Sequence, residues 1–420
     1  MRWSFADRSD MTEINGISLG IDFGTTYSKV CFRFRGSREF VKFGETQFRE
    51  SIVYLHNDKL YYYRPVENSP PVKYFKYSII GEELKNSEID PKLSSVFFLM
   101  CLIEESKKYI KDFLSKKGWN ENIGDFLSIN MGAPIDNFIG DENVKNGKIY
   151  NKIIHSAKEM VQCDLLENYS CDLQKIQDYF GCIKNESTNN ILPELYAETC
   201  TYLAHTNTAD GLYAIIDIGG GTVDIGIFEK RGVEIFVRVK EIWCNGVEVL
   251  IAKTHDKSGL DTDTIRRYIS ERNCNLNEDA IKFLNEQKQE FNNIFNKVLS
   301  NLREYYALNK SISRYNENKI INILICGGGA NCEWYRKCID FNNLIEDNEF
   351  NHEGIPNKRL LISYALAQPL EDIKTEIKSW PLSEKTVKLS IKEYAEKENK
   401  RQDEENIEKP RPLWVPRKRK

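Results

Sequence analysis

The feature that most constrains the fold is the segment "AIIDIGGGTVDIGIF" at 214–228, in which three consecutive glycines lie between Asp217 and Asp224. Apolar residues alternate on both sides of the glycines, which is the period-2 pattern of a strand–turn–strand unit. Glycines let the backbone take positive φ and let another group approach closely. The exposed N–H groups of such a turn can cradle an anion. Because the two acids would repel a bare phosphate, the sequence predicts phosphate together with Mg²⁺ at this turn.

A second hairpin of the same kind lies near the start of the chain. Residues 17–34, "ISLGIDFGTTYSKVCFRF", again alternate apolar and polar positions around a turn that carries Asp22 and two threonines. Asp22 and Asp217 are separated by about the length of one domain. Two similar halves, each with an acid-flanked glycine and threonine turn, predict a nucleotide held between them.

A third glycine turn follows an apolar strand at 320–330, "IINILICGGGA". Small residues there would let an adenine or a ribose lie directly on the backbone, although a tight turn without any ligand has the same pattern. The commoner phosphate motifs fit less well. The chain has no GxxxxGK[ST] sequence, and "GGGTVD" places Asp224 where a dinucleotide fingerprint needs glycine and leads into a strand rather than a helix.

Composition excludes several classes of protein. The chain has 420 residues, 41% hydrophobic and 29% charged, with a net charge of −4. This length allows two or more domains, and this charge gives no global attraction to nucleic acid or to acidic membranes. The N-terminus has no apolar core of a signal peptide, and no apolar run has the length of a membrane helix. Eleven cysteines include no CxxC pair, so we expect reduced thiols rather than a zinc ribbon, in a cytoplasmic protein.

The three turns together resemble a known family. "GIDFGTTYSKV", "IIDIGGGTVDIGIF" and "ILICGGGA" resemble the phosphate-1, phosphate-2 and adenosine motifs of the actin-like ATPase superfamily. They are most similar to the nucleotide-binding domain of DnaK-type heat-shock 70 kDa chaperones. The resemblance implies an α/β fold with two duplicated ribonuclease-H-like lobes and a nucleotide in the interlobe cleft. It divides the chain into an N-terminal extension (1–16), lobe I (17–200), lobe II with a reduced upper subdomain (201–370) and a charged C-terminal tail (371–420).

The resemblance also implies roles for charged residues. Asp22 and Asp217 match the carboxylates that hold Mg²⁺ through water, and Asp224 matches a second acid beside the metal and the attacking water. Lys76, in "YFKYSII", looks like the lysine that reaches the γ-phosphate, although an ordinary solvated lysine is the simpler interpretation. Glu194, in "ILPELYAE", looks like the acid of the segment that joins the lobes, where the chaperones have proline as the next residue.

The loops that would contact ATP or ADP follow from the same motifs. Phosphoryl transfer needs positioning and charge neutralisation more than covalent chemistry, which suits backbone amides, a lysine and Mg²⁺. The nucleotide-binding residues implied by the resemblance are Gly24, Thr25, Thr26, Tyr27, Gly219, Gly220, Gly221, Thr222, Gly327, Gly328 and Gly329.

Three departures from the chaperone pattern limit the transfer of function. Residues 371–420 are about half charged, the composition of a solvated segment rather than of a peptide-binding domain. "ANCEWY" after the third turn lacks the arginine that helps to hold the nucleotide in the chaperones. The stretch between 244–250 and 291–306 is short for the upper subdomain of lobe II. The final "KPRPLWVPRKRK" is either a solvated basic tail or a motif that docks an unidentified protein partner through Trp414.

The sequence therefore predicts a DnaK-like, Mg-ATP-binding ATPase that hydrolyses ATP to ADP and phosphate. It would act as a nucleotide-dependent conformational switch on a protein partner, in the manner of a chaperone, without its own peptide-binding domain. Three alternatives stay open: an actin-like ATP-dependent filament-forming protein, a small-molecule kinase of the same superfamily, and a non-hydrolysing ATP-bound scaffold.

Overall fold

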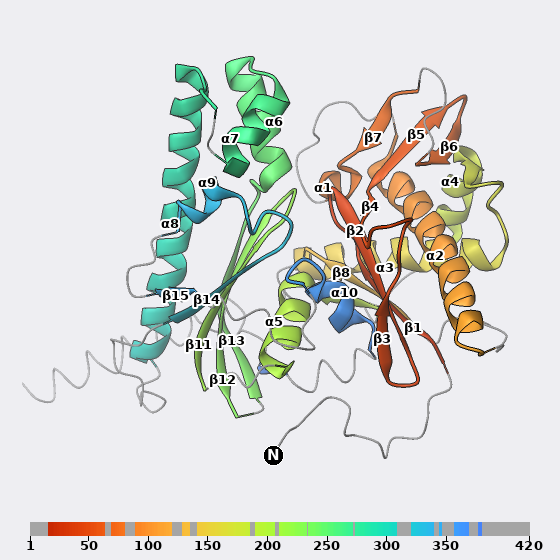
Figure 1. The fold of residues 1–420 in the computed structure, drawn as a ribbon, viewed down its shortest axis with the longest axis horizontal. Coiled ribbons are helices and arrows are strands. Elements are labelled where there is room, and N and C mark those ends of the chain that lie inside the picture. The colour runs from red at the N-terminus through yellow and green to blue at the C-terminus, as the bar shows by residue number, and fades with distance from the viewer. Residues whose placement is uncertain are drawn as a thin grey trace, which may run out of the picture.

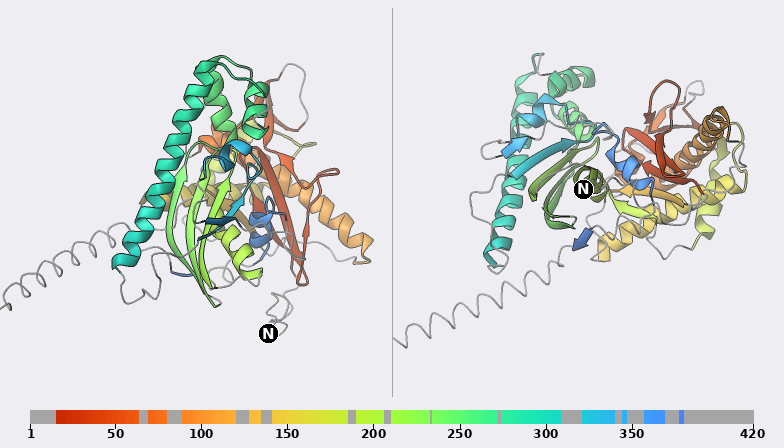
Figure 2. Two further views of the ribbon diagram at one scale, coloured as in Figure 1. Left: turned by 60° about the vertical axis from the view of Figure 1, so that its left-hand side comes forward. Right: turned by 60° about the horizontal axis from the view of Figure 1, so that its bottom comes forward.

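The computed structural model describes residues 16–63, 69–79, 89–119, 128–134, 141–184, 190–205, 210–232, 234–271, 274–308, 321–339, 344–346, 357–368 and 377–379. Two large sheets lie side by side, each with helices on its outer side, and a pair of helices fills the space between them (Figures 1 and 2). Almost all of the predicted N-terminal extension, and the predicted docking motif around Trp414, lie outside the described residues.

The first sheet is built around the hairpin predicted at 17–34. Its strands are β1 (Ser18–Asp22), β2 (Tyr27–Phe34), β3 (Ser37–Phe40), β8 (Ser128–Ala133) and β10 (Ile191–Pro193), with the short β4 (Arg49–Glu50) beside β2. The spatial order is β10-β8-β1-β2-β3. β1, β2 and β3 are antiparallel, whereas β8 runs parallel to β1 and β10 parallel to β8. Every residue of β1 is buried, as its place in the middle of the sheet requires.

The second sheet repeats this arrangement around the hairpin predicted at 214–228. Its strands are β11 (Gly211–Ile218), β12 (Val223–Arg231), β13 (Glu234–Trp243), β14 (Ile321–Cys326), β15 (Leu344–Glu346) and β16 (Ile377–Ser379). The order is β15-β14-β11-β12-β13-β16, again with three antiparallel strands followed by two parallel ones. β16 lies inside the segment predicted as a charged tail and pairs with β13.

The first half also carries a smaller sheet and its own helices. The order β7-β5-β6-β9 joins β5 (Ile52–His56), β6 (Lys59–Tyr62), β7 (Pro71–Lys73) and β9 (Ser170–Asp172). The helices are α1 (Phe75–Ser78), α2 (Pro91–Lys116), α3 (Asp141–Gln162) and α4 (Leu173–Cys182). Residues 93–103 of α2 are buried on every side, which makes this helix the centre of the first core.

Three long or medium helices cover the second half. They are α6 (Val247–Ser258), α7 (Thr262–Glu271) and α8 (Glu278–Leu308), followed by the short α9 (Glu333–Arg336). α8 packs against β12, β13 and α6 and rises beyond the sheet to stand beside α6 and α7 (Figure 1). The part of this half that lies above the sheet in Figure 1 is therefore a group of helices.

Helices α5 (Glu194–His205) and α10 (Leu361–Leu366) pack on each other between the two large sheets (Figure 1). Glycines let them approach the strands. A Cβ on Gly20 of β1 would lie 2.4 Å from the Ser363 carbonyl oxygen of α10, and one on Gly226 of β12 would lie 2.5 Å from the Leu195 side chain of α5. Side chains from both helices and both sheets form one buried cluster, which ties the halves together.

Among the described residues, no helix combines the length and the apolar character that crossing a membrane requires.

Candidate functional site

The β1–β2 turn and the β11–β12 turn touch each other. A Cβ on Gly220 would lie 2.5 Å from Thr26 Oγ1, and one on Gly221 would lie 3.0 Å from Thr25 Oγ1 and 2.8 Å from the Tyr77 ring. Because the shortest distance at each position is too short for a real Cβ, both positions need glycine for the turns to meet. The structure thus brings together two predicted nucleotide loops that lie far apart in the chain.

In the β11–β12 turn, the carbonyl groups are occupied by hydrogen bonds within the protein, whereas three N–H groups are available to a ligand. The carbonyl oxygens of Gly219, Gly220 and Gly221 accept hydrogen bonds from N–H groups at the start of α6 and from the residue just before it, the shortest for each at 2.9 to 3.0 Å. The N–H groups of Gly220, Gly221 and Thr222 have no acceptor within the described part of the chain. Since free backbone donors at a tight turn favour an anion, this turn has the character of a phosphate cradle.

The first turn is fixed by Ser51. The Ser51 hydroxyl donates to the Gly24 carbonyl oxygen at 2.8 Å, and the Ser51 N–H donates to the Thr26 carbonyl oxygen at 2.8 Å. Thr26 Oγ1 is buried and has no hydrogen-bond partner among the described residues. Tyr27, also predicted to bind the nucleotide, is 41% exposed and lies edge-on against Phe48. The Thr26 hydroxyl is therefore available to accept or donate a further hydrogen bond.

Three carboxyl groups converge beside the two turns. One oxygen each from Glu194, Asp217 and Asp224 lies within 4.8 Å of the others, and all three residues are buried. Glu194 is the first residue of α5, whereas Asp217 and Asp224 face each other across the β11–β12 hairpin. The Thr222 hydroxyl donates to Asp224 Oδ2 at 2.9 Å. The structure therefore brings together three of the four predicted catalytic residues as potential ligands of one cation.

Asp217 is the electrostatic centre of this group. Burial, and then the nearby charges of Asp224, Glu194 and Asp22, raise the pKa of Asp217 well above its usual value. Asp217 Oδ1 is buried without a hydrogen-bond partner among the described residues. Gly327, at φ 82°, keeps the space next to it clear, since a Cβ there would lie 2.0 Å from Asp217 Oδ1. A divalent cation would remove the charge repulsion and satisfy the free oxygen.

Lys76, the fourth predicted catalytic residue, lies on α1 and reaches the same group. Its Nζ is 2.5 Å from Glu194 Oε1, and both side chains are nearly fully buried. The simpler interpretation of Lys76 as a solvated lysine is therefore wrong. Burial raises the pKa of Glu194, and the charge of Lys76 opposes that rise.

Asp22, the other predicted metal ligand, has a different partner. Asp22 Oδ2 accepts an ion-paired hydrogen bond from Lys29 Nζ at 2.7 Å, and Asp22 is not part of the three-carboxylate group. Contact of Asp22 with Mg²⁺ through water stays a prediction.

The third glycine turn packs on the second. The Gly329 N–H donates to the Ile218 carbonyl oxygen at 2.8 Å, and a Cβ on Gly329 would lie 2.4 Å from the Ile218 side chain. A Cβ on Gly327 would lie 2.0 Å from Asp217 Oδ1, so this glycine also packs closely, without a hydrogen bond between the two. Packing thus accounts for Gly327 and Gly329 without a ligand, whereas no described atom lies within 4 Å of a Cβ built on Gly328. The adenosine role of this turn stays a prediction that rests on Gly328.

Sequence reasoning missed two charged residues that a simple pattern could have found. Lys29 is the residue opposite Asp22 in the hairpin register, and counting outward from the turn would have paired them. Glu198 lies one helical turn after Glu194 and is buried, so the i, i+4 spacing placed both acids on one face of α5.

A third missed residue, Glu248, connects the two halves. The Tyr74 hydroxyl donates to Glu248 Oε2 at 3.2 Å, and Arg266 binds both carboxylate oxygens of Glu248 at 2.5 and 2.8 Å. Burial and the Glu248 charge raise the pKa of Tyr74 to about 12. These partners lie far apart in the sequence, and no local pattern marks them.

Comparison with known proteins gives a distant likeness. No family model matches the chain. The chain is 24% identical over 232 residues to the mitochondrial "Heat shock 70-related protein 1" of Leishmania major, covering 54% of this chain and 34% of that protein. It is 23% identical over 242 residues to the mitochondrial "Heat shock 70 kDa protein" of Trypanosoma cruzi, covering 54% of this chain and 33% of that protein.

A third relative carries a different name. The chain is 24% identical over 262 residues to the "DNA ligase" of Mycoplasmopsis synoviae (strain 53), covering 58% of this chain and 36% of that protein. The chain spans about a third of the length of the curated relatives it matches. The comparisons therefore show a distant similarity to heat shock 70-related proteins over about half of the chain, and identity at this level assigns no activity by itself.

Proposed function

We propose that this protein is a DnaK-like ATPase of the actin-like superfamily, which binds Mg-ATP between its two halves and acts as a nucleotide-dependent switch on a protein partner. The observation that carries the proposal is the contact of two glycine turns from two sheets of the same strand order, directly beside the Glu194, Asp217 and Asp224 group.

The repeated fold supports this proposal. Strands β10-β8-β1-β2-β3 and β15-β14-β11-β12-β13 have the same order and sense, and α5 and α10 lie between them. A duplicated pair of lobes with a nucleotide between them would need this arrangement. The similarity to heat shock 70-related proteins covers about half of the chain and points to the same family.

The residues fit Mg²⁺ and a polyphosphate. Mg²⁺ prefers carboxylate oxygens and keeps several waters, and when bound it neutralises phosphate charge. Asp217 and Asp224 would hold it, because Asp217 Oδ1 has no other partner among the described residues. The free N–H groups of the second turn would bind phosphate oxygens. Lys76, positioned by Glu194, would place a buried positive charge beside them.

The contacts between the halves support a switch. The turns touch where the phosphates would lie, and Tyr74 and Glu248 join the halves beside them. A ligand that replaces the direct turn-to-turn contact would change the relative position of the two sheets, which is how a nucleotide can drive domain closure. The binding partner that responds to this change in the relative position of the sheets would be a protein.

ATP binding and turnover by the purified protein with Mg²⁺ test the proposal. Asp217→Asn should lower phosphate release on the order of 100-fold, the loss that follows removal of one charge-stabilising group. Asp210→Asn is the matched control, because Asp210 is exposed and lies near the distant end of β11. Equal turnover in Asp217→Asn and parent would contradict the site assignment. Tight binding without turnover in the parent would favour the scaffold alternative, and absence of binding would reject a nucleotide function.

A further inference from the structure

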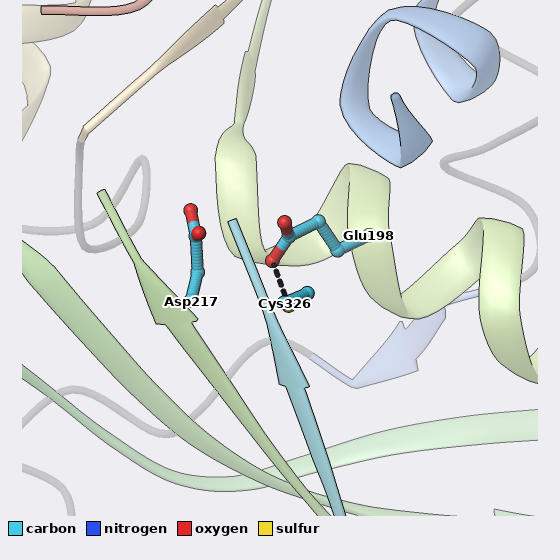
Figure 3. Close-up of side chains that lie close together, drawn as sticks. All are labelled: Glu198, Asp217 and Cys326. Atoms are coloured by element: carbon cyan, nitrogen blue, oxygen red, sulfur yellow. Dashed lines mark hydrogen bonds between the residues drawn. The ribbon is translucent and has the colours of Figure 1, made fainter. Parts of the chain in front are cut away.

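A second group of buried side chains, two carboxyl groups and a thiol, adjoins the three-carboxylate group through Asp217. Glu198 from α5, Asp217 from the end of β11 and Cys326 from the end of β14 lie close together, and a hydrogen bond joins Cys326 to Glu198 (Figure 3). Each contributes one potential ligand atom, and these atoms lie within 4.8 Å of one another. All three residues are buried, with exposed fractions of 1%, 5% and 0%. The group differs from the three-carboxylate group because it contains a thiol.

Two of the three side chains form a hydrogen bond with each other, whereas the third has an oxygen without a hydrogen-bond partner among the described residues. Cys326 Sγ donates to Glu198 Oε2 at 3.1 Å and has a weaker contact with the Ile216 carbonyl oxygen at 3.6 Å. Asp217 Oδ1, in contrast, is buried without a hydrogen-bond partner among the described residues. Gly327 keeps the adjoining space free of a side chain. An unsatisfied carboxylate oxygen that adjoins a thiol and a second carboxyl group is the arrangement of an incomplete coordination shell.

The electrostatics of the group favour a bound cation. Glu198 and Asp217 are both carboxylic acids, and both are nearly fully buried. Neither Glu198 nor Asp217 forms a salt bridge within the described part of the chain. Such a group is stable either when its members hold their protons or when a cation replaces those protons.

We propose that Glu198, Asp217 and Cys326 form a binding site for a divalent cation that accepts thiolate, such as Zn²⁺, and that this site shares Asp217 with the proposed Mg²⁺ site. A cysteine sulfur and carboxylate oxygens are ligands of Zn²⁺, whereas Mg²⁺ takes oxygen ligands. Three protein ligands leave a fourth tetrahedral position for water. On binding, the Cys326 sulfur gives its proton to solvent and forms the bond to the metal, so uptake weakens as pH falls.

Asp217 belongs to both groups. A cation bound to Cys326 would therefore take a ligand from the Mg²⁺ site and slow ATP turnover. This consequence rests on the proposed function, whereas the binding of the metal does not.

Co²⁺, a spectroscopic substitute for Zn²⁺, tests the site in the reduced, nucleotide-free full chain. A Co²⁺–thiolate bond gives a charge-transfer absorption band in the near ultraviolet. We expect a saturable band in the parent that is lost in Cys326→Ala and retained in Cys338→Ala. Cys338 is a matched control, because it is a buried thiol whose Sγ donates to the Trp334 carbonyl oxygen at 3.1 Å and which is not a member of the proposed group. Cys326→Ser serves as a second variant if the alanine variant does not fold.

Two further variants separate this site from the nucleotide site. Glu198→Gln should weaken Co²⁺ binding about tenfold or more, because an amide is a poor ligand. Asp224→Asn should keep the band, since Asp224 is not a member of this group, although it should lose ATP turnover. No band in the parent, or a band that persists in Cys326→Ala through the exposed Cys163, Cys182 or Cys244, would overturn the metal site and leave the ATPase proposal standing.

Discussion

The two glycine turns have matching strands and opposite electrostatics. In the β1–β2 hairpin, the residue opposite Asp22 is Lys29, and the two form an ion pair at 2.7 Å. In the β11–β12 hairpin, the residue opposite Asp217 is Asp224, so two buried acids face each other. The same register position thus holds a cation in one half of the molecule and an anion in the other.

The difference assigns separate roles to the two hairpins. The first neutralises its own acid and supplies a hydroxyl, Thr26 Oγ1, to the contact between the turns. The second leaves Asp217 with a raised pKa and a free oxygen. A protein gains nothing for folding from an uncompensated buried acid pair, so the second hairpin is the one that needs a ligand to complete it.

The largest expected effect comes from removing the cation of the first hairpin. Lys29→Met leaves Asp22 buried without its partner, and we expect the free energy of unfolding in urea to fall by about 3–5 kcal/mol. The double variant with Asp22→Asn should recover most of this loss. Lys59→Met, which breaks the exposed pair with Glu167, is the control and should cost much less. If Lys29→Met and Lys59→Met lower the free energy of unfolding equally, the stability of the first hairpin does not depend on its ion pair.

The second hairpin should respond in activity rather than stability. Asp224→Asn removes one of two facing acids, so we expect ATP turnover to fall on the order of 100-fold, about 3 kcal/mol, while the melting temperature does not fall. Phosphate release and thermal unfolding measure the two effects on the same sample. Unchanged turnover, or a clear loss of stability with turnover retained, would assign Asp224 to folding.

The contact between the hairpins can be tested sterically. Gly220→Ala places a Cβ 2.5 Å from Thr26 Oγ1, and overpacking of this kind costs about 1–3 kcal/mol of unfolding free energy. Adding Thr26→Ala removes the clashing atom and should restore stability, whereas Thr26→Val keeps the volume and should not. Gly181→Ala is the control, since nothing lies within 4 Å of its Cβ. Equal behaviour of the two double variants would show that the turns do not touch in solution.

The smallest effect is a pH dependence of the second hairpin. The pKa of Asp217 is raised in the folded state, so its contribution to stability is complete below the ordinary carboxyl pKa and is lost as pH rises through the raised value. Asp217→Asn cannot ionise. The melting temperature of this variant minus that of the parent should therefore increase from mild acid to neutral pH. A difference that stays constant with pH would mean that the carboxyl group of Asp217 is already compensated.

The hairpins, the glycine turns and their acids could be predicted from the sequence, because each depends on local rules. Alternation of apolar residues fixed the strands around 17–34 and 214–228, and three glycines marked close approach. The presence of glycine did not show, however, whether a ligand or another part of the chain lies next to it. Gly327 faces Asp217 and Gly329 faces Ile218, so two of three glycines expected to bind adenosine are required by packing.

What the sequence determined by itself is the position of the strands, the turns and most of the acids, since period and turn chemistry act between near neighbours in the chain. Only the tertiary structure decided which charges meet. Lys76 reaches Glu194, Tyr74 reaches Glu248 and Cys326 reaches Glu198 across many intervening residues. The physical reason is that burial and Coulomb interactions depend on distance through space, and the ends of β11, β14 and α5 become neighbours only when the second sheet and the helices between the halves have packed.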